Sequence, residues 1–267
     1  MTSTETLVTY EVQDGVASLT LTNPPANAYS YEMMLQLDRH ILDARMDDGV
    51  HVILVTGTGD RFFCAGADIA ILQTMTPERK ASFCLHANET MCRLEQTPKL
   101  VIAALNGHTV GGGLEVAMAC DLRVSWRGAG KLGLPEVKLG VLPGTGGTQR
   151  LTRALGKARA MEMMMEGGTV DFEQARELGL VNKVMDADSH GSFMEQAMAY
   201  ARGFCPPATA SQAVGLIKRA CQTGGETSLE IGLALERELQ NRLFAAEDAA
   251  EGLAAYNERR KPSFRGR

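Results

Sequence analysis

The chain has 267 residues, of which 45% are hydrophobic and 22% are charged, so it can bury a sizeable core without disulfide or metal support. Its formal net charge of −5 argues against non-specific nucleic-acid binding, which depends on basic side chains that neutralise phosphates. The six cysteines form no CxxC pair and the five histidines form no ligand-spaced cluster, so we expect reduced, mostly buried thiols, no metal site and an intracellular protein.

The N-terminal stretch MTSTETLVTYEV has no charged segment followed by an apolar run, so we do not expect a secretory signal. It contains Glu5 and no arginine, which argues against a mitochondrial transit peptide. No apolar run is long enough to span a bilayer. We therefore expect a cytoplasmic protein with no membrane partner.

The first part of the chain begins with two β-branched runs, Leu7–Val12 and Val16–Thr22, around Asp14-Gly15, which predicts a β-hairpin. Apolar residues at helical spacing then predict a helix over Tyr31–Met46. Strands and helices alternate further on: strands at His51–Thr56, Leu100–Leu105 and Asp121–Trp126, and helices at Pro77–Gln96 and Leu114–Ala119. Because these strands are apolar throughout, the pattern predicts a parallel sheet in an α/β fold.

The strand pattern ends near Leu180–Met185, and the rest of the chain reads as helical. Helices are predicted over Ser192–Cys205, Pro207–Gln222 and Thr227–Ala255. This divides the chain into an α/β core domain, residues 1–200, and an all-α region, residues 201–267. The apolar faces of the second part must pack on its own body or on a neighbouring subunit, and the sequence leaves both open.

Two glycine-containing loops follow predicted strands, Cys64–Asp68 (CAGAD) and Gly111–Glu115 (GGGLE). Glycines let a backbone approach a ligand and leave amides free, and the second loop also opens a helix, whose N-terminus favours negative charge. One amide from each loop could bind a thioester oxygen. A plain tight turn explains either loop equally well. The GTGG at Gly144–Gly147 resembles a dinucleotide loop only weakly, because it follows Pro143 rather than a first strand.

Two glutamates stand out beside these loops. Glu115 falls in the first turn of the predicted helix, and Glu136 follows Pro135 in a predicted loop. A dipole-stabilised acid and a solvated loop acid are the ordinary interpretations of these positions. Hydration of a conjugated thioester, however, needs a base that takes a proton from water and an acid that protonates Cα. Two carboxyl groups in one pocket tend to separate in pKa, which suits both roles.

Several stretches in order resemble the crotonase, or enoyl-CoA hydratase/isomerase, superfamily. These are NPPANA, FCAGADIAIL, NGHTVGGGLEVAMACDLRV, GLPEVKLGVLPGTGGTQRLTRALG and the ending EGLAAYNERRKPSFRGR. The resemblance spans nearly the whole chain. It implies a spiral of ββα units with a C-terminal helical trimerisation region, assembled as a homotrimer or a hexamer (a dimer of trimers).

The resemblance also implies roles for individual residues. It places the oxyanion hole at the amides of Ala67 and Gly112, the catalytic pair at Glu115 and Glu136, and a water-holding amide at Gly144. Coenzyme A of the acyl-CoA substrate is expected near Ala26, Asn27, Ala65 and Asp68, with Tyr256 and Arg259 of a neighbouring subunit covering it. No separate cofactor is implied, since coenzyme A is part of the substrate.

Both glutamates favour an enoyl-CoA hydratase, because the related Δ3,Δ2-isomerases commonly keep a single carboxylate. The alternatives are such an isomerase or another crotonase-type lyase, and a non-catalytic scaffold or RNA-binding member. Four features depart from the pattern. The stretch between the glutamates, with RGAGK at Arg127–Lys131, is one residue longer than usual. Leu134 stands where glutamine is frequent, Thr109 where a small apolar residue is usual, and Tyr256 where phenylalanine is common. The extra residue could shift Glu136.

Overall fold

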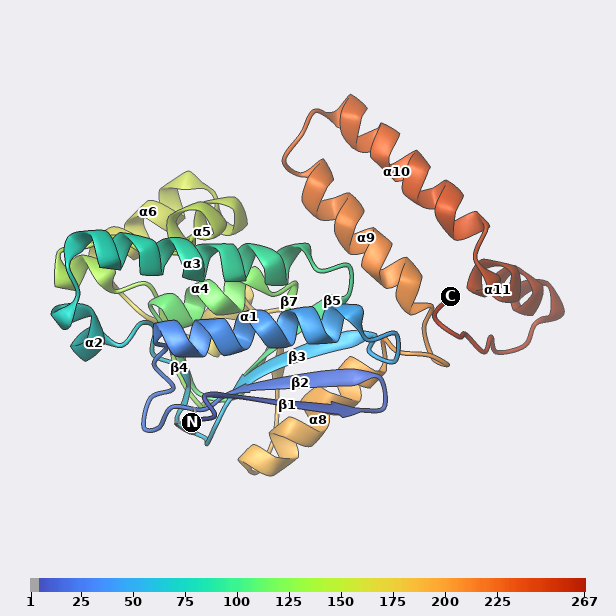
Figure 1. The fold of residues 1–267 in the computed structure, drawn as a ribbon. Helices are drawn as coiled ribbons and strands as arrows, with labels where there is room; N and C mark the ends of the chain where they lie inside the picture. The colour runs from blue at the N-terminus through green and yellow to red at the C-terminus, as the bar shows by residue number, and fades with distance from the viewer. Residues whose placement is uncertain (1–4) are drawn as a thin grey trace.

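The structure is a computed structural model that describes residues 5–267, and residues 1–4 of the N-terminal stretch considered above lie outside the described part. A six-stranded sheet lies at its centre, in the order β1-β2-β3-β5-β7-β10 (Figure 1). The strands are β1 (Val8–Gln13), β2 (Val16–Leu21), β3 (Val52–Gly57), β5 (Leu100–Leu105), β7 (Leu122–Trp126) and β10 (Lys183–Met185).

The first two strands form the predicted hairpin, since β1 pairs antiparallel with β2. Asp14 (φ 51°) and Gly15 (φ 80°) both have positive φ, as a two-residue hairpin turn requires. Every other neighbouring pair in this sheet is parallel, which confirms the predicted parallel α/β architecture.

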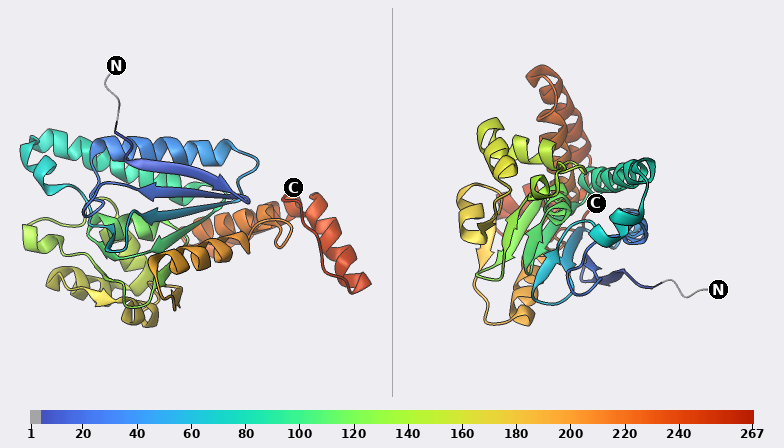
Figure 2. Two further views of the ribbon diagram at one scale, coloured as in Figure 1. Left: turned by 90° about the horizontal axis from the view of Figure 1, so that it is seen from below. Right: turned by 90° about the vertical axis from the view of Figure 1, so that its left-hand side faces the viewer.

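Both faces of the large sheet are covered, which explains why its strands are apolar throughout. On β3, Ile53 and Val55 face one cluster with helix α1, whereas Val52 and Leu54 face another with helix α8. Figures 1 and 2 show α1 and α3 on one side of the sheet and α8 on the other. The helices of this body are α1 (Tyr31–Met46), α2 (Ile69–Thr74), α3 (Pro77–Gln96), α4 (Gly112–Ala119), α5 (Gly147–Leu155), α6 (Lys157–Glu166), α7 (Phe172–Glu177) and α8 (His190–Arg202).

A second, smaller sheet was not predicted. It has the order β4-β6-β8-β9, with strands β4 (Phe62–Cys64), β6 (His108–Val110), β8 (Lys131–Gly133) and β9 (Val170–Asp171). The β4, β6 and β8 strands are parallel, so their carboxyl ends meet at one edge. The loops that leave this edge carry the predicted oxyanion residues and Glu136.

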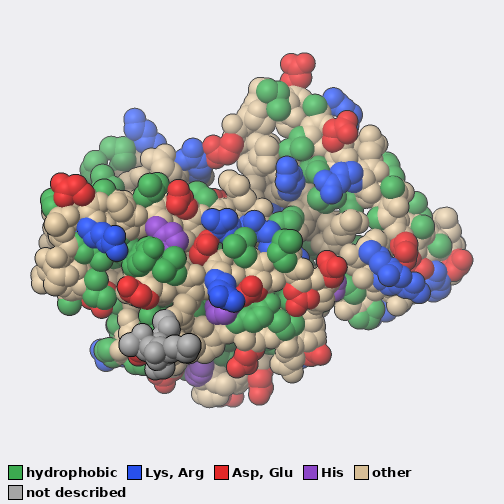
Figure 3. All heavy atoms as spheres, viewed as in Figure 1, with side chains coloured by type: hydrophobic (Ala, Val, Ile, Leu, Met, Phe, Trp, Pro, Cys, Tyr) green, Lys and Arg blue, Asp and Glu red, His purple; other side chains and the backbone are tan. Residues whose placement is uncertain are grey.

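Three helices form what we call the C-terminal arm: α9 (Ser211–Gly224), α10 (Leu229–Phe244) and α11 (Glu247–Glu258). The single helix predicted over Thr227–Ala255 is wrong, because the chain breaks between α10 and α11. Figures 1 and 2 show α10 and α11 extending away from the body. Large apolar side chains are exposed there, among them Leu229 (77% exposed) and Phe244 (66%), and hydrophobic atoms are visible on this arm in Figure 3.

The arm is attached to the body through α9. The buried Lys218 ammonium lies 2.8 Å from the Asp121 carboxylate and donates to the Lys99 carbonyl at 3.0 Å. At Gly215 an added Cβ would lie 2.2 Å from the Pro98 carbonyl oxygen, so this helix packs on the body at backbone contact distance. The predicted division at residues 200 and 201 falls near the end of α8, before this attachment.

All six cysteines are free thiols, of which three are buried, two half-buried and one exposed. Within residues 5–267, no helix has both the length and the hydropathy needed to cross a bilayer.

Candidate active site

The two glycine-containing loops come together because β4 and β6 are parallel neighbours. One loop leaves β4 and leads to α2, and the other leaves β6 and opens α4. An added Cβ on Gly66 would lie 2.8 Å from the Gly112 nitrogen, so the two backbones are in contact. Gly66 also has φ of +91°, a conformation that favours glycine. The close approach that the sequence only suggested is therefore present.

Both predicted oxyanion amides are unused. Ala67 and Tyr29 form an isolated parallel β-bridge. Its hydrogen bonds run from the Tyr29 amide to the Gly66 carbonyl and from the Asp68 amide to the Tyr29 carbonyl, so the Ala67 amide takes no part in them. Gly112 is the first residue of α4 and has no preceding helical carbonyl to pair with. Among residues 5–267, neither amide has a hydrogen-bond acceptor. Two free amides on adjoining loops, one at a helix N-terminus, suit an oxygen with developing negative charge.

Glu115 lies in the first turn of α4 and is only 2% exposed. Its Oε1 accepts from the Thr145 amide at 2.8 Å and from the Gly147 amide at 2.7 Å, and its Oε2 accepts from the Thr145 hydroxyl. Gly147 begins α5, so the positive end of that helix dipole also faces the carboxyl group. These three hydrogen bonds satisfy both carboxyl oxygens of Glu115 and fix the orientation of its side chain.

Glu136 has the opposite environment. It opens a short 3-10 helix, η1 (Glu136–Leu139), so the prediction of a plain loop is corrected. Its side chain reaches the α4 loop, where an added Cβ on Gly111 would lie 3.1 Å from Glu136 Oε1. Its Oε2 is buried and has no hydrogen-bond partner among the residues that the structure describes. Burial, and to a smaller extent the charge of Glu115, raises the pKa of Glu136 to about 7, against the opposing effect of its own backbone amide.

The longer stretch between the glutamates lies outside the strands that lead to Glu136. Strand β8 keeps its register on β6, and the Gly111 amide donates to the Gly133 carbonyl at 2.9 Å. The longer stretch forms the surface turn between β7 and β8, where Gly128 has φ of +71° and an added Cβ would meet nothing. Arg127 in this turn pairs with Glu173 and Asp186. The turn is thus anchored by its own ion pairs, and β8, which leads to Glu136, is anchored by β6.

Gly144 lies immediately before Thr145, whose amide and hydroxyl bind Glu115. Gly144 is itself exposed, and within the described part of the chain its amide has no acceptor. Gly144 is therefore next to a residue that binds Glu115, and its role in holding water stays a prediction.

The residues predicted around coenzyme A fall into two groups. Ala65 donates to the Ala26 carbonyl at 3.0 Å, so these two lie together beside the oxyanion loop. Asp68 caps α2, and the buried Asn27 side chain donates to the carbonyls of Thr58 and Phe62. Both polar side chains thus have structural partners, and a role for either in binding coenzyme A stays a prediction.

Tyr256 and Arg259 lie at the end of α11, far from the two glycine-containing loops in the same chain (Figure 1). Tyr256 is 85% exposed. A contribution of these residues to the site requires a second copy of the chain, as the resemblance implied.

Three contributors to the site were missed: Tyr29, Thr145 and Gly147. The two amides and the hydroxyl from the GTGG stretch all point to Glu115. That stretch was considered only as a nucleotide loop. The sequence signal that could have identified it is a glycine pair that begins a helix, since such amides bind anions of the protein as well as of ligands.

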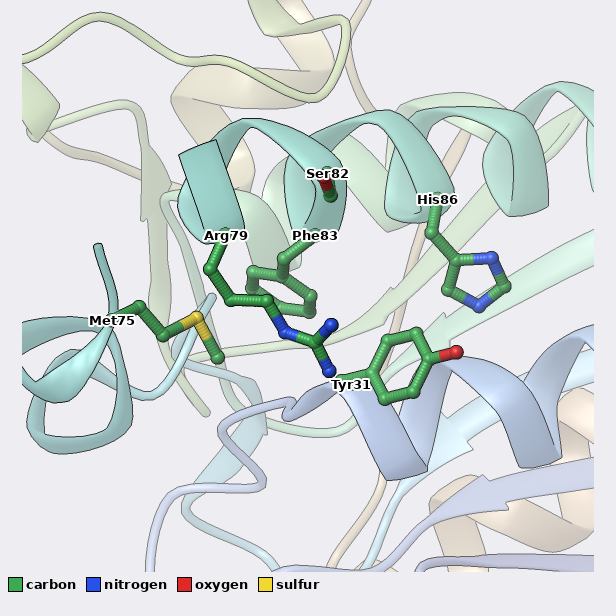
Figure 4. Close-up of a pocket in the computed structure, with 6 residues that line it drawn as sticks. All are labelled: Tyr31, Met75, Arg79, Ser82, Phe83 and His86. Atoms are coloured by element: carbon green, nitrogen blue, oxygen red, sulfur yellow. The ribbon is translucent and has the colours of Figure 1, made fainter. Parts of the chain in front are cut away.

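A pocket of about 180 Å³ opens next to the site, between the start of α1, the end of α2 and the first turns of α3 (Figure 4). It is lined by Tyr31, Met75, Arg79, Ser82, Phe83 and His86. The Arg79 guanidinium lies over the Tyr31 ring at 5.6 Å, and among the described residues it has no carboxylate partner. Phe83 lines this pocket and also packs on Tyr29, with ring centroids 6.0 Å apart.

The chain is similar to known proteins in both sequence and structure. A family model described as enoyl-CoA hydratase/isomerase matches residues 11–267. A Bacillus subtilis protein named probable enoyl-CoA hydratase is 38% identical, covering 97% of this chain and 98% of its own. The 2,3-dehydroadipyl-CoA hydratase of Escherichia coli is 37% identical, covering 96% and 97%. A crystal structure of an enoyl-CoA hydratase from Geobacillus kaustophilus superposes with a TM-score of 0.94 at 43% identity, covering 99% and 98%.

Proposed function

Because the chain belongs to the enoyl-CoA hydratase/isomerase family, we propose that it is an enoyl-CoA hydratase, which reversibly adds water to a 2-enoyl-CoA to give a 3-hydroxyacyl-CoA. The observation that carries this proposal is the contrast between the two glutamates. Glu115 accepts three hydrogen bonds, whereas Glu136 has a buried oxygen without a partner and a raised pKa. This contrast supports Glu115 as the base and Glu136 as the acid, two roles that hydration needs at the same time.

The proposed reaction begins with the thioester oxygen accepting from the Ala67 and Gly112 amides. Glu115 takes a proton from water as the water oxygen bonds to Cβ, and the electron pair of the double bond moves to form the thioester enolate. The amides stabilise the negative charge that develops on the enolate oxygen. Glu136 then donates its proton to Cα, on the same face as the water, so that addition is syn. The proton gained by Glu115 and the one lost by Glu136 are exchanged with solvent before the next turnover.

The remaining predicted parts belong to the same proposal. The Gly144 amide holds the attacking water, and coenzyme A lies along Ala26, Asn27, Ala65 and Asp68. No resident cofactor is needed, because water and the thioester supply every atom of the product. We further propose that the exposed apolar side chains of the C-terminal arm join copies into a trimer or a dimer of trimers. Tyr256 and Arg259 of a neighbouring copy then cover coenzyme A.

The pocket in Figure 4 bears on the acyl group. The Escherichia coli relative is named for an acyl group with a second carboxylate. Among residues 5–267, the Arg79 guanidinium has no carboxylate partner, and it lies over the Tyr31 ring in the pocket that Phe83 also lines. We therefore include acyl groups that end in a carboxylate among the proposed substrates. In the wild type and in Arg79→Gln, kcat/KM should be compared for crotonyl-CoA and 2,3-dehydroadipyl-CoA. Selective loss with the second substrate supports this assignment, and equal loss with both contradicts it.

The activity itself is tested by loss of the conjugated-thioester absorbance of crotonyl-CoA. Glu115→Gln and Glu136→Gln should each lower kcat by roughly two to four orders of magnitude while binding of the CoA ester persists. Conversion of a 3-enoyl-CoA without any hydroxyacyl product would instead identify an isomerase. Tight RNA binding that survives Glu115→Ala, with no turnover of any enoyl-CoA, would identify a non-catalytic member.

A further inference from the structure

The phenol of Tyr29 is buried next to the catalytic glutamates. Tyr29 is 2% exposed, and its backbone forms the bridge that holds Ala67. An added Cβ on Gly112 would lie 2.1 Å from the Tyr29 hydroxyl oxygen. The side chain therefore occupies the space beside the second oxyanion amide, while its backbone supports the first.

The hydroxyl of Tyr29 also extends the hydrogen-bond network of Glu115. It lies 3.4 Å from the Thr145 hydroxyl oxygen, and that hydroxyl is bonded to Glu115 Oε2. A carboxylate only accepts, so the single hydroxyl proton of Thr145 must point to Glu115. Thr145 then accepts from Tyr29, and the donation runs in one direction, from Tyr29 to Thr145 to Glu115.

Two further observations support this direction. Burial, followed by the charge of Glu115, raises the pKa of Tyr29 well above its ordinary value, so the phenol keeps its proton and remains a donor. Leu134 is fully buried, and its Cδ1 and Glu115 Oε1 both border Gly147. Leu134 offers no donor, so the side-chain hydrogen bonding of Glu115 comes from Thr145 and, through it, from Tyr29.

We propose that Tyr29 is a positioning residue for hydration, which acts through the Thr145 hydroxyl to hold Glu115 as a carboxylate in one orientation; this inference rests on the function proposed above. A donor to the charged form of an acid favours that form. Removing the phenol hydroxyl should therefore weaken the hydrogen bonding that favours the carboxylate form of Glu115 and leave its side chain harder to orient. As a result, kcat would fall without a matching change in substrate binding.

The test uses Tyr29→Phe, which keeps the ring and its packing, with Thr145→Val and Thr145→Ser as matched variants. Tyr29→Phe should lower kcat roughly threefold to tenfold, and Thr145→Val roughly tenfold to a hundredfold, at nearly constant KM. The acidic limb of kcat/KM against pH should move to higher pH in both. Thr145→Ser, which keeps a hydroxyl, should stay close to the wild type. In a Thr145→Val background, Tyr29→Phe should add nothing, because its effect passes through Thr145.

A kcat/KM profile of Tyr29→Phe that superposes on the wild type would overturn the proposal, as would an additive effect in the double variant. If Thr145→Val does not fold, Tyr29→Phe and Thr145→Ser still carry the test. A readout independent of turnover is the NMR signal of the Glu115 carboxyl carbon at one fixed pH, which should change in Tyr29→Phe because the hydrogen bonding of Thr145 to Glu115 changes. If the wild type hydrates no enoyl-CoA, the proposed function fails, and this signal still decides whether Tyr29 acts on Glu115.

Discussion

The carboxyl group of Glu136 has a pKa of about 7 in the free protein, and in the proposed mechanism it must be protonated to deliver a proton to Cα. Because kcat/KM reports the free enzyme, it should fall as Glu136 ionises. The sign follows from the role: an acid catalyst is lost as pH rises through its pKa. With a pKa of about 7, about half of the limiting kcat/KM should remain at pH 7 and about one tenth at pH 8.

The assay is hydration of crotonyl-CoA between pH 5 and 9, in buffers of constant ionic strength, alongside NMR titration of the Glu136 carboxyl carbon. In Glu115→Gln the negative charge that raises the pKa of Glu136 is removed, so the NMR titration should move to lower pH. Burial is the larger cause and persists, so the titration should stay above the ordinary range of a glutamate. A wild-type profile that is flat from pH 6 to 9, or an NMR midpoint in the ordinary range, would refute the reasoning.

Three further predictions concern the oxyanion loop, the attachment of the arm and the assembly. Gly112→Ala should lower kcat roughly a hundredfold or more, because the added Cβ would displace the Tyr29 phenol and the oxyanion amide. As a control, Gly168→Ala should be neutral in the same assay, because an added Cβ there meets nothing. Lys218→Ala should lower the free energy of unfolding by about 3 kcal/mol in urea titrations, because it leaves the buried Asp121 without its cation. Tyr256→Ala should raise KM for enoyl-CoA at unchanged secondary structure. Light scattering of the wild-type protein should give a mass that is a multiple of three chains, and a monomer with full activity would contradict the proposed assembly.

Long elements were predictable because their own residues determine them. The helix over Tyr31–Met46 and the strand over Leu100–Leu105 have the predicted bounds, since each carries enough apolar residues to show its period. The small sheet could not be predicted in this way. Strands of two or three residues, such as Val170–Asp171, have no measurable period and exist only through pairing with distant partners. The break between α10 and α11 carries neither glycine nor proline, so the sequence gives no stop signal there.

The candidate site likewise contains residues that the local sequence identifies and residues that only the folded structure brings together. Glu115 and Gly112 were found because they share one turn of one helix, where the chemistry of a helix N-terminus is local. Tyr29 and Thr145 are 116 residues apart, and only the packed fold brings their hydroxyls together. The separate environments of Glu115 and Glu136 also depend on burial and on donors from other segments, which no local pattern contains.

The surface turn between β7 and β8 has a consequence for engineering. The strand that follows it is held in register by β6, so the turn can vary in length while the reacting groups stay where they are. At Gly128, where the surroundings are open, a short epitope or a spectroscopic label could be grafted into the loop. Such a label would lie on the protein surface while the strand that follows it keeps its pairing with β6.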